Sequence, residues 1–235
     1  MLNGLDLTLE RGRTTALVGI SGAGKSTIVK LLLGLLKPQS GRVLVDGVDL
    51  ATVDLGSYYT EVAYIPQEPP VFDGTIRENL AFDADLPDPT LTDAVAGAGL
   101  GQLIERLPDG LDTVVGERGT KLSGGERQRL AYARLLIQQP RIVVMDEPPA
   151  SLDSLTEAAV TETLTGFLAG RTVIVIAHRI QTVRTADRIV VLDDGRMVQD
   201  GDFDALVTAP GVFRDMWMEQ TGGNREHGRH DEQQA

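Results

Sequence analysis

Gly19-Ile20-Ser21-Gly22-Ala23-Gly24-Lys25-Ser26-Thr27 is the stretch that decides the fold. It matches the phosphate-loop pattern G-x-x-x-x-G-K-[S/T]. A short β-branched and apolar run precedes it at residues 14–18, and the apolar stretch Ile28–Leu36 follows it. These flanks predict a buried strand before the loop and a buried helix after it. The sequence therefore predicts a strand–loop–helix unit that binds a phosphate group.

The residue types of this loop suit the binding of a nucleotide. Glycines let backbone N–H groups turn toward an anion, and a helix N-terminus adds unpaired N–H groups and a positive dipole end. We expect Lys25 to reach the β- and γ-phosphates and the Ser26 hydroxyl to ligate Mg²⁺. The other expected contacts come from Gly19, Ser21, Gly22, Ala23, Gly24 and Thr27. The alternative is a glycine-rich turn that only caps a helix.

Composition limits the class of protein. The chain has 235 residues, which suffices for one large α/β domain or for a core with a smaller inserted domain. A net charge of −12 argues against a general nucleic-acid binder and against charge-driven binding to anionic lipid. The absence of cysteine excludes disulfides and thiolate metal sites. The apolar runs are too short to cross a bilayer, and the N-terminus lacks the pattern of a signal peptide.

Strand signals occur at both ends of the chain. Leu2–Glu10 alternates apolar and polar residues, which is typical of a strand with one buried face. The pairs Asp46-Gly47 and Asp194-Gly195 are typical of tight hairpin turns. Continuous apolar runs in the second half predict buried parallel strands. The further predicted strands are Val43–Val45, Val48–Leu50, Val62–Ile65, Arg141–Met145, Thr172–Ala177 and Arg188–Leu192.

The composition and the hydrophobic pattern of the sequence change between about Glu68 and Pro140. Prolines and acidic residues interrupt the first part of this segment, and helical patterns follow at Thr90–Leu107 and Gly125–Gln138. We interpret the segment as an α-helical insertion. The polar stretch Gln220–Ala235 has no periodicity and is predicted to be a disordered tail.

The predicted fold class is therefore α/β. A phosphate-loop, RecA-like core with a parallel sheet and an antiparallel β subdomain occupies residues 1–67 and 141–219. The helical subdomain occupies residues of about 68–140, and the tail occupies residues 220–235.

Two acids follow a predicted buried strand. Asp146 and Glu147 come directly after the apolar run 142–145. Carboxylates at the end of a parallel strand face the crevice in which α/β proteins bind ligands. In phosphate-loop enzymes this position holds the Mg²⁺-linked aspartate, which predicts that role for Asp146. Glu147 is placed to act as a general base toward an attacking water. The alternative is a pair of solvated acids.

Leu122-Ser123-Gly124-Gly125-Glu126 opens a predicted helix. Ser123 and Glu126 fit a capping box, which is the structural interpretation. A serine and two glycines before a helix also fit a second anion site, at Ser123, Gly124 and Gly125. One nucleotide needs one phosphate cradle, so two cradles in one chain suggest that two chains each contribute half of a site.

Two further polar residues follow predicted strands. His178 comes directly after Thr172–Ala177, where it could donate a hydrogen bond to a γ-phosphate, although a lone histidine is more often a plain surface or core residue. Gln67 follows Val62–Ile65, and its amide oxygen could ligate Mg²⁺ or hold a water.

Together these residues resemble the nucleotide-binding domain of an ABC transporter of the exporter type. The resemblance runs from Leu2 to about Met218. The loop 19–27 resembles the Walker A motif, and residues 142–147 resemble the Walker B motif. Gln67 corresponds to the Q-loop and residues 122–126 to the signature motif. Residues 151–153 resemble the D-loop, and His178 resembles the switch histidine. Val71–Leu80 and Gly116–Gly119 (the X-loop) are similar to exporter-type cassettes, in which the X-loop contacts the coupling helices of the membrane domain.

The resemblance implies an ATPase with ATP and Mg²⁺ as ligands. It implies Ser26, Gln67 and Asp146 near Mg²⁺, and Lys25, Glu147 and His178 in hydrolysis. It also implies two partners, a second cassette that supplies Ser123–Gly125 in trans and a membrane domain. The expected place is the cytoplasmic face of a membrane, or the cytoplasm if the chain acts alone.

The sequence departs from the family pattern in two places. Exporter-type cassettes carry an aromatic residue upstream of Walker A that stacks on adenine, and none of the 18 residues before Gly19 is aromatic. The first strand and the six-helix membrane domain normally fused ahead of the cassette are also missing. Pro148-Pro149 stiffen the segment before the D-loop.

Other functions compatible with these motifs are a truncated nucleotide-binding remnant with little ATPase activity and a soluble ABC ATPase that acts on DNA or ribosomes. A GTPase is disfavoured because no N-K-x-D motif is present.

Overall fold

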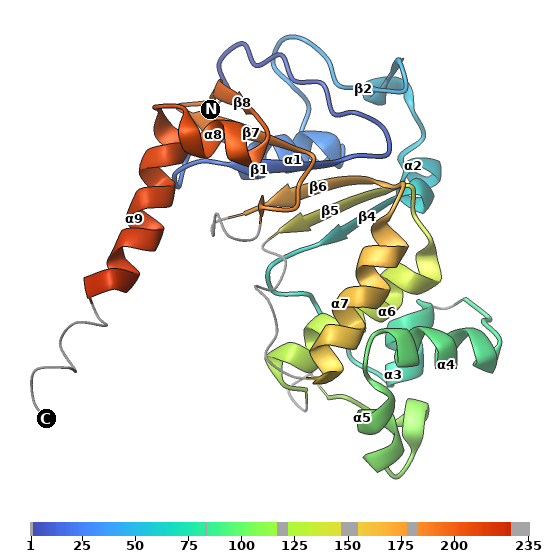
Figure 1. Cartoon of the computed structure of the whole chain (residues 1–235). Coiled ribbons are helices and arrows are strands. Elements are labelled where there is room, and N and C mark those ends of the chain that lie inside the picture. The colour runs from blue at the N-terminus through green and yellow to red at the C-terminus, as the bar shows by residue number, and fades with distance from the viewer. Residues whose placement is uncertain (1, 83, 117–121, 147–154, 178–182, 227–235) are drawn as a thin grey trace, which may run out of the picture. The chain divides into compact units, whose positions relative to one another are not determined.

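A computed structural model describes residues 2–82, 84–116, 122–146, 155–177 and 183–226 (Figure 1). The chain divides into two compact units. The first comprises Met1–Tyr59, Val144–Ala150 and Gly170–Ala235, and the second comprises Thr60–Val143 and Ser151–Ala169. The predicted helical subdomain at about 68–140 lies within the second unit, which extends further at both ends.

The first unit carries the phosphate loop and most of the strands. Its elements are β1 (Thr14–Val18), α1 (Lys25–Leu32), β2 (Leu44–Val45), β3 (Val48–Asp49), a 3₁₀ turn (Leu50–Thr52), most of α2 (Leu55–Glu61), the end of β5 (Ile142–Asp146), β6 (Thr172–Ile176), β7 (Arg188–Asp193), β8 (Arg196–Gly201), α8 (Phe203–Thr208) and α9 (Val212–Glu226).

The main sheet has the strand order β4-β5-β6-β1-β7-β8. β1 lies parallel to both of its neighbours, with Leu17 opposite Ile176 of β6 and Val190 of β7. Ala16, Leu17 and β7 residues 189–192 are fully buried, as expected of apolar strands covered on both faces. The parallel core, the antiparallel strands and the helices confirm the predicted α/β class.

Both predicted hairpins form. β2 pairs with β3 in a separate two-stranded sheet, and β7 pairs with β8 at one edge of the main sheet. The residues of both turns, Asp46-Gly47 and Asp194-Gly195, have positive φ, as a two-residue turn of this kind requires.

The predicted strand at Leu2–Glu10 is wrong. The leucines at 2, 5, 7 and 9 are half-buried and most of the residues between them are exposed, so the alternation does describe the burial. The segment nevertheless forms no ladder with any described strand. Instead the Asn3 N–H donates to the Gly195 carbonyl at 2.9 Å, and the Arg188 guanidinium donates to the Thr8 carbonyl at 2.6 Å. Alternation predicts a buried face but not a hydrogen-bonded neighbour.

The helix after the phosphate loop differs at both ends from the predicted Ile28–Leu36. α1 begins at Lys25, so the end of the loop motif forms its first turn. It ends at Leu32, because Gly34 takes a φ of +69°, which breaks the helix. Leu35 and Leu36 are therefore 62% and 45% exposed.

The second unit is mostly helical. Its elements are the end of α2, β4 (Val62–Ile65), α3 (Ile76–Ala81), α4 (Asp88–Gly97), α5 (Gly101–Arg106), a 3₁₀ turn (Gly110–Asp112), α6 (Gly124–Gln138), the start of β5 and α7 (Leu155–Leu168). α3 and α4 pack on α6, and α7 packs on α4.

One helix predicted in the second unit forms as two separate helices. Thr90–Leu107 divides into α4 and α5, because Gly99 has a φ of +70°. The predicted helix Gly125–Gln138 is confirmed as α6, which begins one residue earlier.

The predicted disorder of the tail is wrong from Gln220 to Glu226, because α9 continues through these residues. The start of α9 is anchored by aromatic packing. The Phe203 ring contacts Phe213 and Trp217 edge to face, at 5.8 and 5.3 Å between centroids. A helix nucleated by such packing extends into a polar segment at little cost. Residues 227–235 lie outside the described part of the chain.

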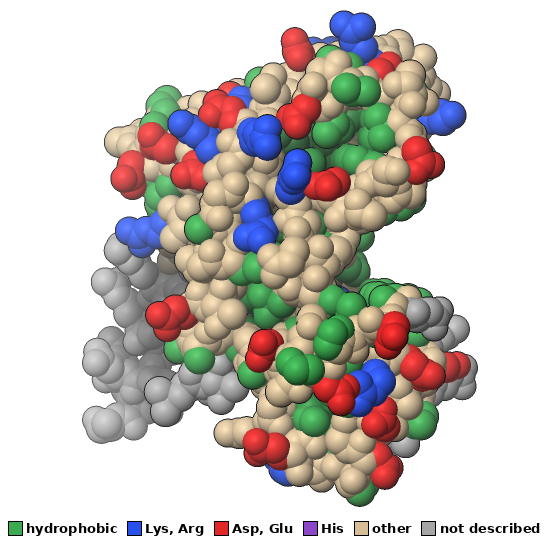
Figure 2. Space-filling model, turned by 90° about the vertical axis from the view of Figure 1, so that its right-hand side faces the viewer, with side chains coloured by type: hydrophobic (Ala, Val, Ile, Leu, Met, Phe, Trp, Pro, Cys, Tyr) green, Lys and Arg blue, Asp and Glu red, His purple; other side chains and the backbone are tan. Residues whose placement is uncertain are grey.

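The surface mixes both signs of charge. On the face drawn in Figure 2, lysine and arginine side chains lie among acidic ones rather than in one basic patch. Within the part of the chain that the structure describes, no helix combines the length and apolar content that a bilayer span requires.

Candidate functional site

The glycines of the phosphate loop fit its backbone closely. Gly19 has a φ of +156°, and a Cβ there would overlap the carbonyl oxygen of Leu192 on β7. Gly24 has a φ of +106°, and a Cβ there would lie 2.6 Å from the Leu2 side chain. Glycine is therefore the residue that suits this turn at both positions.

The loop offers backbone donors for an anion. The N–H groups of Ser21, Gly22 and Gly24 donate no hydrogen bond within the described part of the chain. Gly24 caps α1, and within the described residues no side chain forms a capping hydrogen bond at this helix end. Such a cradle suits a group with several negatively charged oxygens.

Lys25 lies across the loop. Its side chain is buried, with 5% exposure, and its ammonium donates to the carbonyl oxygens of Gly19 at 2.5 Å and Ile20 at 3.1 Å. The ammonium is therefore held at the loop by the loop itself. This places a positive charge beside the candidate phosphate site, and the role of Lys25 toward a nucleotide stays a prediction.

The other loop residues divide between solvent and core. Ser21 and Ser26 are exposed, and Ser26 lies in the first turn of α1, where its hydroxyl is open to a ligand. Ala23 is buried, and its N–H donates to the Ile20 carbonyl at 3.2 Å. Thr27 is half-buried, and its N–H donates to the Gly24 carbonyl at 3.0 Å. Ser26 is thus the loop side chain that fits a Mg²⁺ ligand best.

Asp146 lies in the same unit as the loop. It is half-buried and ends β5, which neighbours β6 in the sheet. β6 in turn ends level with β1, because the Ala177 N–H donates to the Leu17 carbonyl. Glu147 and His178, which directly follow β5 and Ala177, lie outside the described residues, as do 148–153 of the predicted D-loop region.

The remaining predicted ligands belong to the second unit. Gln67 is exposed and follows β4. Ser123, Gly124 and Gly125 are exposed at the N-terminus of α6. Gln67 and the N-terminus of α6 therefore lie at the surface of their own unit.

The predicted capping box at Ser123 is present. The Glu126 N–H donates to Ser123 Oγ at 3.3 Å, and Glu126 Oε2 accepts from the Ser123 N–H at 2.7 Å and from its hydroxyl at 2.8 Å. Burial raises the pKa of Glu126, but the hydrogen bonds from Ser123 outweigh it, so the pKa lies below its ordinary value. The cap thus holds a charged carboxylate and leaves the hydroxyl beside an exposed helix end.

Two stretches that resembled exporter-type cassettes meet in the second unit. Thr75 forms an antiparallel bridge with Val114, and the Val115 N–H donates to the Gly74 carbonyl at 2.9 Å. This bridge joins Val71–Leu80 to the residues just before Gly116–Gly119, of which only Gly116 is described.

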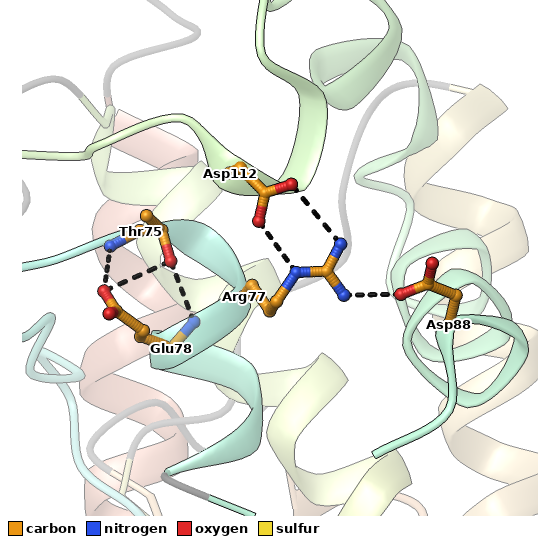
Figure 3. Close-up of polar contacts among 5 residues, drawn as sticks. All are labelled: Thr75, Arg77, Glu78, Asp88 and Asp112. Carbon is orange, nitrogen blue, oxygen red and sulfur yellow. Dashed lines mark hydrogen bonds and ion pairs between the residues drawn. The ribbon is translucent and has the colours of Figure 1, made fainter. Parts of the chain in front are cut away.

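Arg77 reinforces this junction (Figure 3). Its guanidinium contacts Asp112 at 2.8 Å and Asp88 at 2.5 Å. Its hydrogen bond to Asp112, followed by that to Asp88, raises the pKa of Arg77, and Arg77 lowers the pKa of Asp112. A second capping box, formed by Thr75 and Glu78, begins α3 beside it.

The structure adds a cluster that the sequence analysis did not identify. Phe72 and Phe82 are 52% and 55% exposed and contact each other edge to face at 5.6 Å between centroids. Arg134 of α6 lies against both rings. The sequence did contain a signal for this cluster: Arg134 is a charged residue between the apolar residues Ala133 and Leu135 of a predicted helix.

Comparison with known proteins agrees with this geometry. A family model described as ABC transporter matches residues 2–150. The mycobactin import ATP-binding/permease protein IrtB of Mycolicibacterium thermoresistibile is 45% identical over 221 residues, which cover 94% of this chain and 38% of that protein. An ATM1-type heavy metal exporter of Novosphingobium aromaticivorans is 42% identical over 227 residues, covering 96% of this chain and 37% of the exporter.

A solved structure of similar fold is a bacterial Atm1-family ABC exporter with ATP bound. It superposes with a TM-score of 0.87 at 41% identity, over 93% of this chain and 38% of that chain. The present chain thus spans less than two fifths of the length of these relatives.

Proposed function

Because the chain belongs to the ABC transporter family, we propose that it is the ATP-binding and ATP-hydrolysing motor of an exporter-type transporter. The observation that carries the proposal is the phosphate loop, where the N–H groups of Ser21, Gly22 and Gly24 have no partner among the described residues and the Lys25 ammonium lies beside them. Hydrogen-bond donors and one fixed positive charge in one turn match the triphosphate of a nucleotide.

The loop residues would bind the phosphates directly. Gly19–Thr27 would surround them, and Lys25 would exchange its bonds to the Gly19 and Ile20 carbonyls for bonds to phosphate oxygens. An N⁺–H bond to a phosphate oxygen is stronger than one to a neutral carbonyl, so the exchange favours the bound state.

Ser26, Gln67 and Asp146 would hold Mg²⁺, because hydroxyl, amide and carboxylate oxygens are the ligands that this hard cation takes. Mg²⁺ when bound would neutralise charge on the transferred phosphoryl group. Glu147 would accept a proton from the attacking water, and His178 would donate a hydrogen bond on the γ-phosphate side.

We propose that two chains close head to tail over two ATP molecules. The support is the exposed N-terminus of α6, where Ser123, Gly124 and Gly125 would form a second anion-binding turn. Each nucleotide would then lie between the phosphate loop of one chain and Ser123–Gly125 of its partner. Because each composite site needs residues from both chains, ATP itself would hold the dimer together.

The proposed second partner is a transmembrane domain or subunit at the cytoplasmic face of a membrane. The support is twofold. Relatives of this chain are named ATP-binding/permease proteins. Phe72 and Phe82 form an exposed aromatic pair, and Phe72 lies two residues before Gly74, whose carbonyl accepts from the Val115 N–H. Exposed aromatic pairs are typical anchors of protein interfaces. The relatives include an import protein and an exporter, so the proposal concerns the motor rather than a cargo or a direction.

The test is ATP binding and hydrolysis by the purified chain. Lys25→Ala should weaken ATP binding measured by calorimetry by about tenfold or more, because a charged hydrogen bond to phosphate is lost. Lys30→Ala, an exposed lysine on the same helix, is the matched control and should bind like the wild type. Equal affinity of Lys25→Ala and Lys30→Ala would sink the phosphate-loop assignment.

Hydrolysis is tested separately at Glu147. Glu147→Gln should bind ATP, hydrolyse it very slowly and accumulate as an ATP-bound dimer in analytical ultracentrifugation. Wild-type turnover in this variant would contradict the proposed general base. A wild-type chain that binds ATP without hydrolysing it, alone and with a membrane partner, would identify a remnant instead of a motor.

A further inference from the structure

The cluster around Arg134 has no part in the nucleotide chemistry proposed above. It consists of Arg134 on α6, Asn79 on α3, and the rings of Phe72 and Phe82. All four residues belong to the second unit.

Arg134 is held by neutral groups. Nε donates to the Asn79 carbonyl at 2.7 Å, one terminal nitrogen to the Pro70 carbonyl at 2.7 Å and the other to Asn79 Oδ1 at 2.8 Å. Its guanidinium carbon lies 5.6 Å from the Phe72 centroid and 4.9 Å from the Phe82 centroid. Burial lowers the pKa of Arg134 to about 10, which leaves it charged at neutral pH.

Asn79 links Arg134 to the backbone of Phe72. The asparagine is buried, with 1% exposure. Its Oδ1 accepts from the Phe72 N–H at 2.9 Å, and its Nδ2 donates to the Phe72 carbonyl at 2.8 Å and to the Thr75 carbonyl at 2.9 Å. Both backbone polar groups of Phe72 are therefore fixed by the side chain on which Arg134 rests.

Phe82 is held in a strained conformation. Its φ is +46°, in the left-handed region that a bulky residue rarely adopts. Its contacts on the ring side include Phe72 and Arg134. A strained, half-exposed aromatic residue persists where neighbouring contacts enforce it, and such strain occurs often at functional surfaces.

We propose that Arg134 is a positioning residue that holds the exposed Phe72–Phe82 pair on α6, so that the orientation of the pair follows this helix. The contacts alone support the holding. The consequence rests on the proposed function, because the other end of α6 is the Ser123–Gly125 turn assigned to the partner's nucleotide. Arg134 comes ten residues after Gly124 in α6, a distance of about 15 Å along a rigid helix. Closure over ATP would then reorient the aromatic pair presented to the membrane partner.

The test uses fluorine NMR of the full chain labelled with 4-fluorophenylalanine. The chain has five phenylalanines, and Phe72→Tyr and Phe82→Tyr assign the two lines of interest. Arg134→Gln removes the charge and the fork of donors, and Arg134→Lys keeps only the charge. Arg141→Gln is the matched control, since Arg141 is an exposed arginine of the same unit with an ion pair to Glu61.

Spectra recorded without nucleotide test whether Arg134 holds the Phe72 and Phe82 rings, independently of any effect of ATP. In Arg134→Gln and Arg134→Lys, both lines should move toward the position of free fluorophenylalanine, while Arg141→Gln should leave them in place. Unchanged lines in Arg134→Gln would overturn the proposal, and unchanged lines in Arg134→Lys would show that charge, not the directed contacts, fixes the rings. Phe82→Leu, at an exposed position, should move the Phe72 line even if Arg134 variants fold poorly.

Spectra with Mg²⁺ and ATP test the link to α6. Added ATP should shift the Phe82 line in the parent chain but not in Arg134→Gln, whose ATP affinity by calorimetry should stay within about twofold of the parent. An equal ATP-induced shift in both chains would overturn the link. Failure of the parent to bind ATP would instead refute the proposed function, and the spectra without nucleotide would still decide the holding.

Discussion

Gly19 is the loop residue at which a side chain is least compatible with the backbone. A Cβ there would overlap the Leu192 carbonyl oxygen, whereas a Cβ at Gly22, at a φ of +87°, would meet no atom within 4 Å. Gly22→Ala should therefore lower the free energy of unfolding only by the strain of a left-handed alanine, about 1–2 kcal/mol. Gly19→Ala should lower it by about 3 kcal/mol or more, because the sheet or the loop must move.

Urea denaturation of the two variants measures this difference. ATP binding should be lost or strongly reduced in Gly19→Ala and retained in Gly22→Ala, because only the first displaces the strand that supports the loop. Similar stability of the two variants would contradict the close approach of Gly19 to β7.

The residues of the phosphate loop could be predicted from sequence because their roles are local. A turn of small residues before a helix leaves N–H groups unpaired wherever it occurs. The sequence could not show that Lys25 bends back to the Gly19 and Ile20 carbonyls, nor that Arg134 lies between Phe72 and Phe82, since both depend on which groups the fold brings near. The roles of Glu147 and His178 stay predictions.

At the scale of elements, α3 and α6 begin with the same device. Ser123 with Glu126 and Thr75 with Glu78 each form a complete capping box. Replacing either N-cap residue by alanine should lower the free energy of unfolding by about 1 kcal/mol. Only Ser123→Ala should also lower ATPase activity, by about tenfold or more, because it removes a hydroxyl assigned to the partner's nucleotide.

Thr75→Ala is therefore the control that separates a cap from a ligand. Chemical denaturation should give the two variants similar free energies of unfolding. Steady-state ATP hydrolysis should be lower in Ser123→Ala than in Thr75→Ala. Equal activity of both variants would mean that Ser123 acts only as a cap.

The helices and strands show which features a sequence pattern can predict and which it cannot. Apolar runs placed β1, β5, β6 and β7 almost to the residue, because a strand covered on both faces must be continuously apolar. Helix ends were misplaced at Gly34 and Gly99, whose positive φ ends a helix that the apolar pattern continues. The extended segment after Leu2 needed a strand partner, and a pattern within one segment cannot supply a partner.

At the scale of the whole molecule, the proposed head-to-tail dimer makes a prediction that no single chain can satisfy. Lys25→Ala damages the site built on its own loop, and Ser123→Ala damages the site built on its partner's loop. In a mixed dimer both defects fall in one site, and the other site combines the intact loop of the Ser123→Ala chain with the intact turn of the Lys25→Ala chain. Mixing the two impaired variants should therefore raise hydrolysis above that of either variant alone.

Equal amounts of the two variants, mixed and assayed for phosphate release, should recover up to about a quarter of wild-type activity, since half of randomly paired dimers are mixed and each carries one intact site of two. Dilution should abolish the recovery, because the mixed dimer dissociates. Two controls fix the interpretation. The Lys25→Ala, Ser123→Ala double variant alone should show no recovery. Thr75→Ala mixed with Lys25→Ala should give about twice the activity of Thr75→Ala mixed with the double variant, because a mixed dimer keeps one intact site in the first case and none in the second. If the Lys25→Ala and Ser123→Ala mixture is no more active than the two variants measured alone while both variants fold, the composite site is refuted.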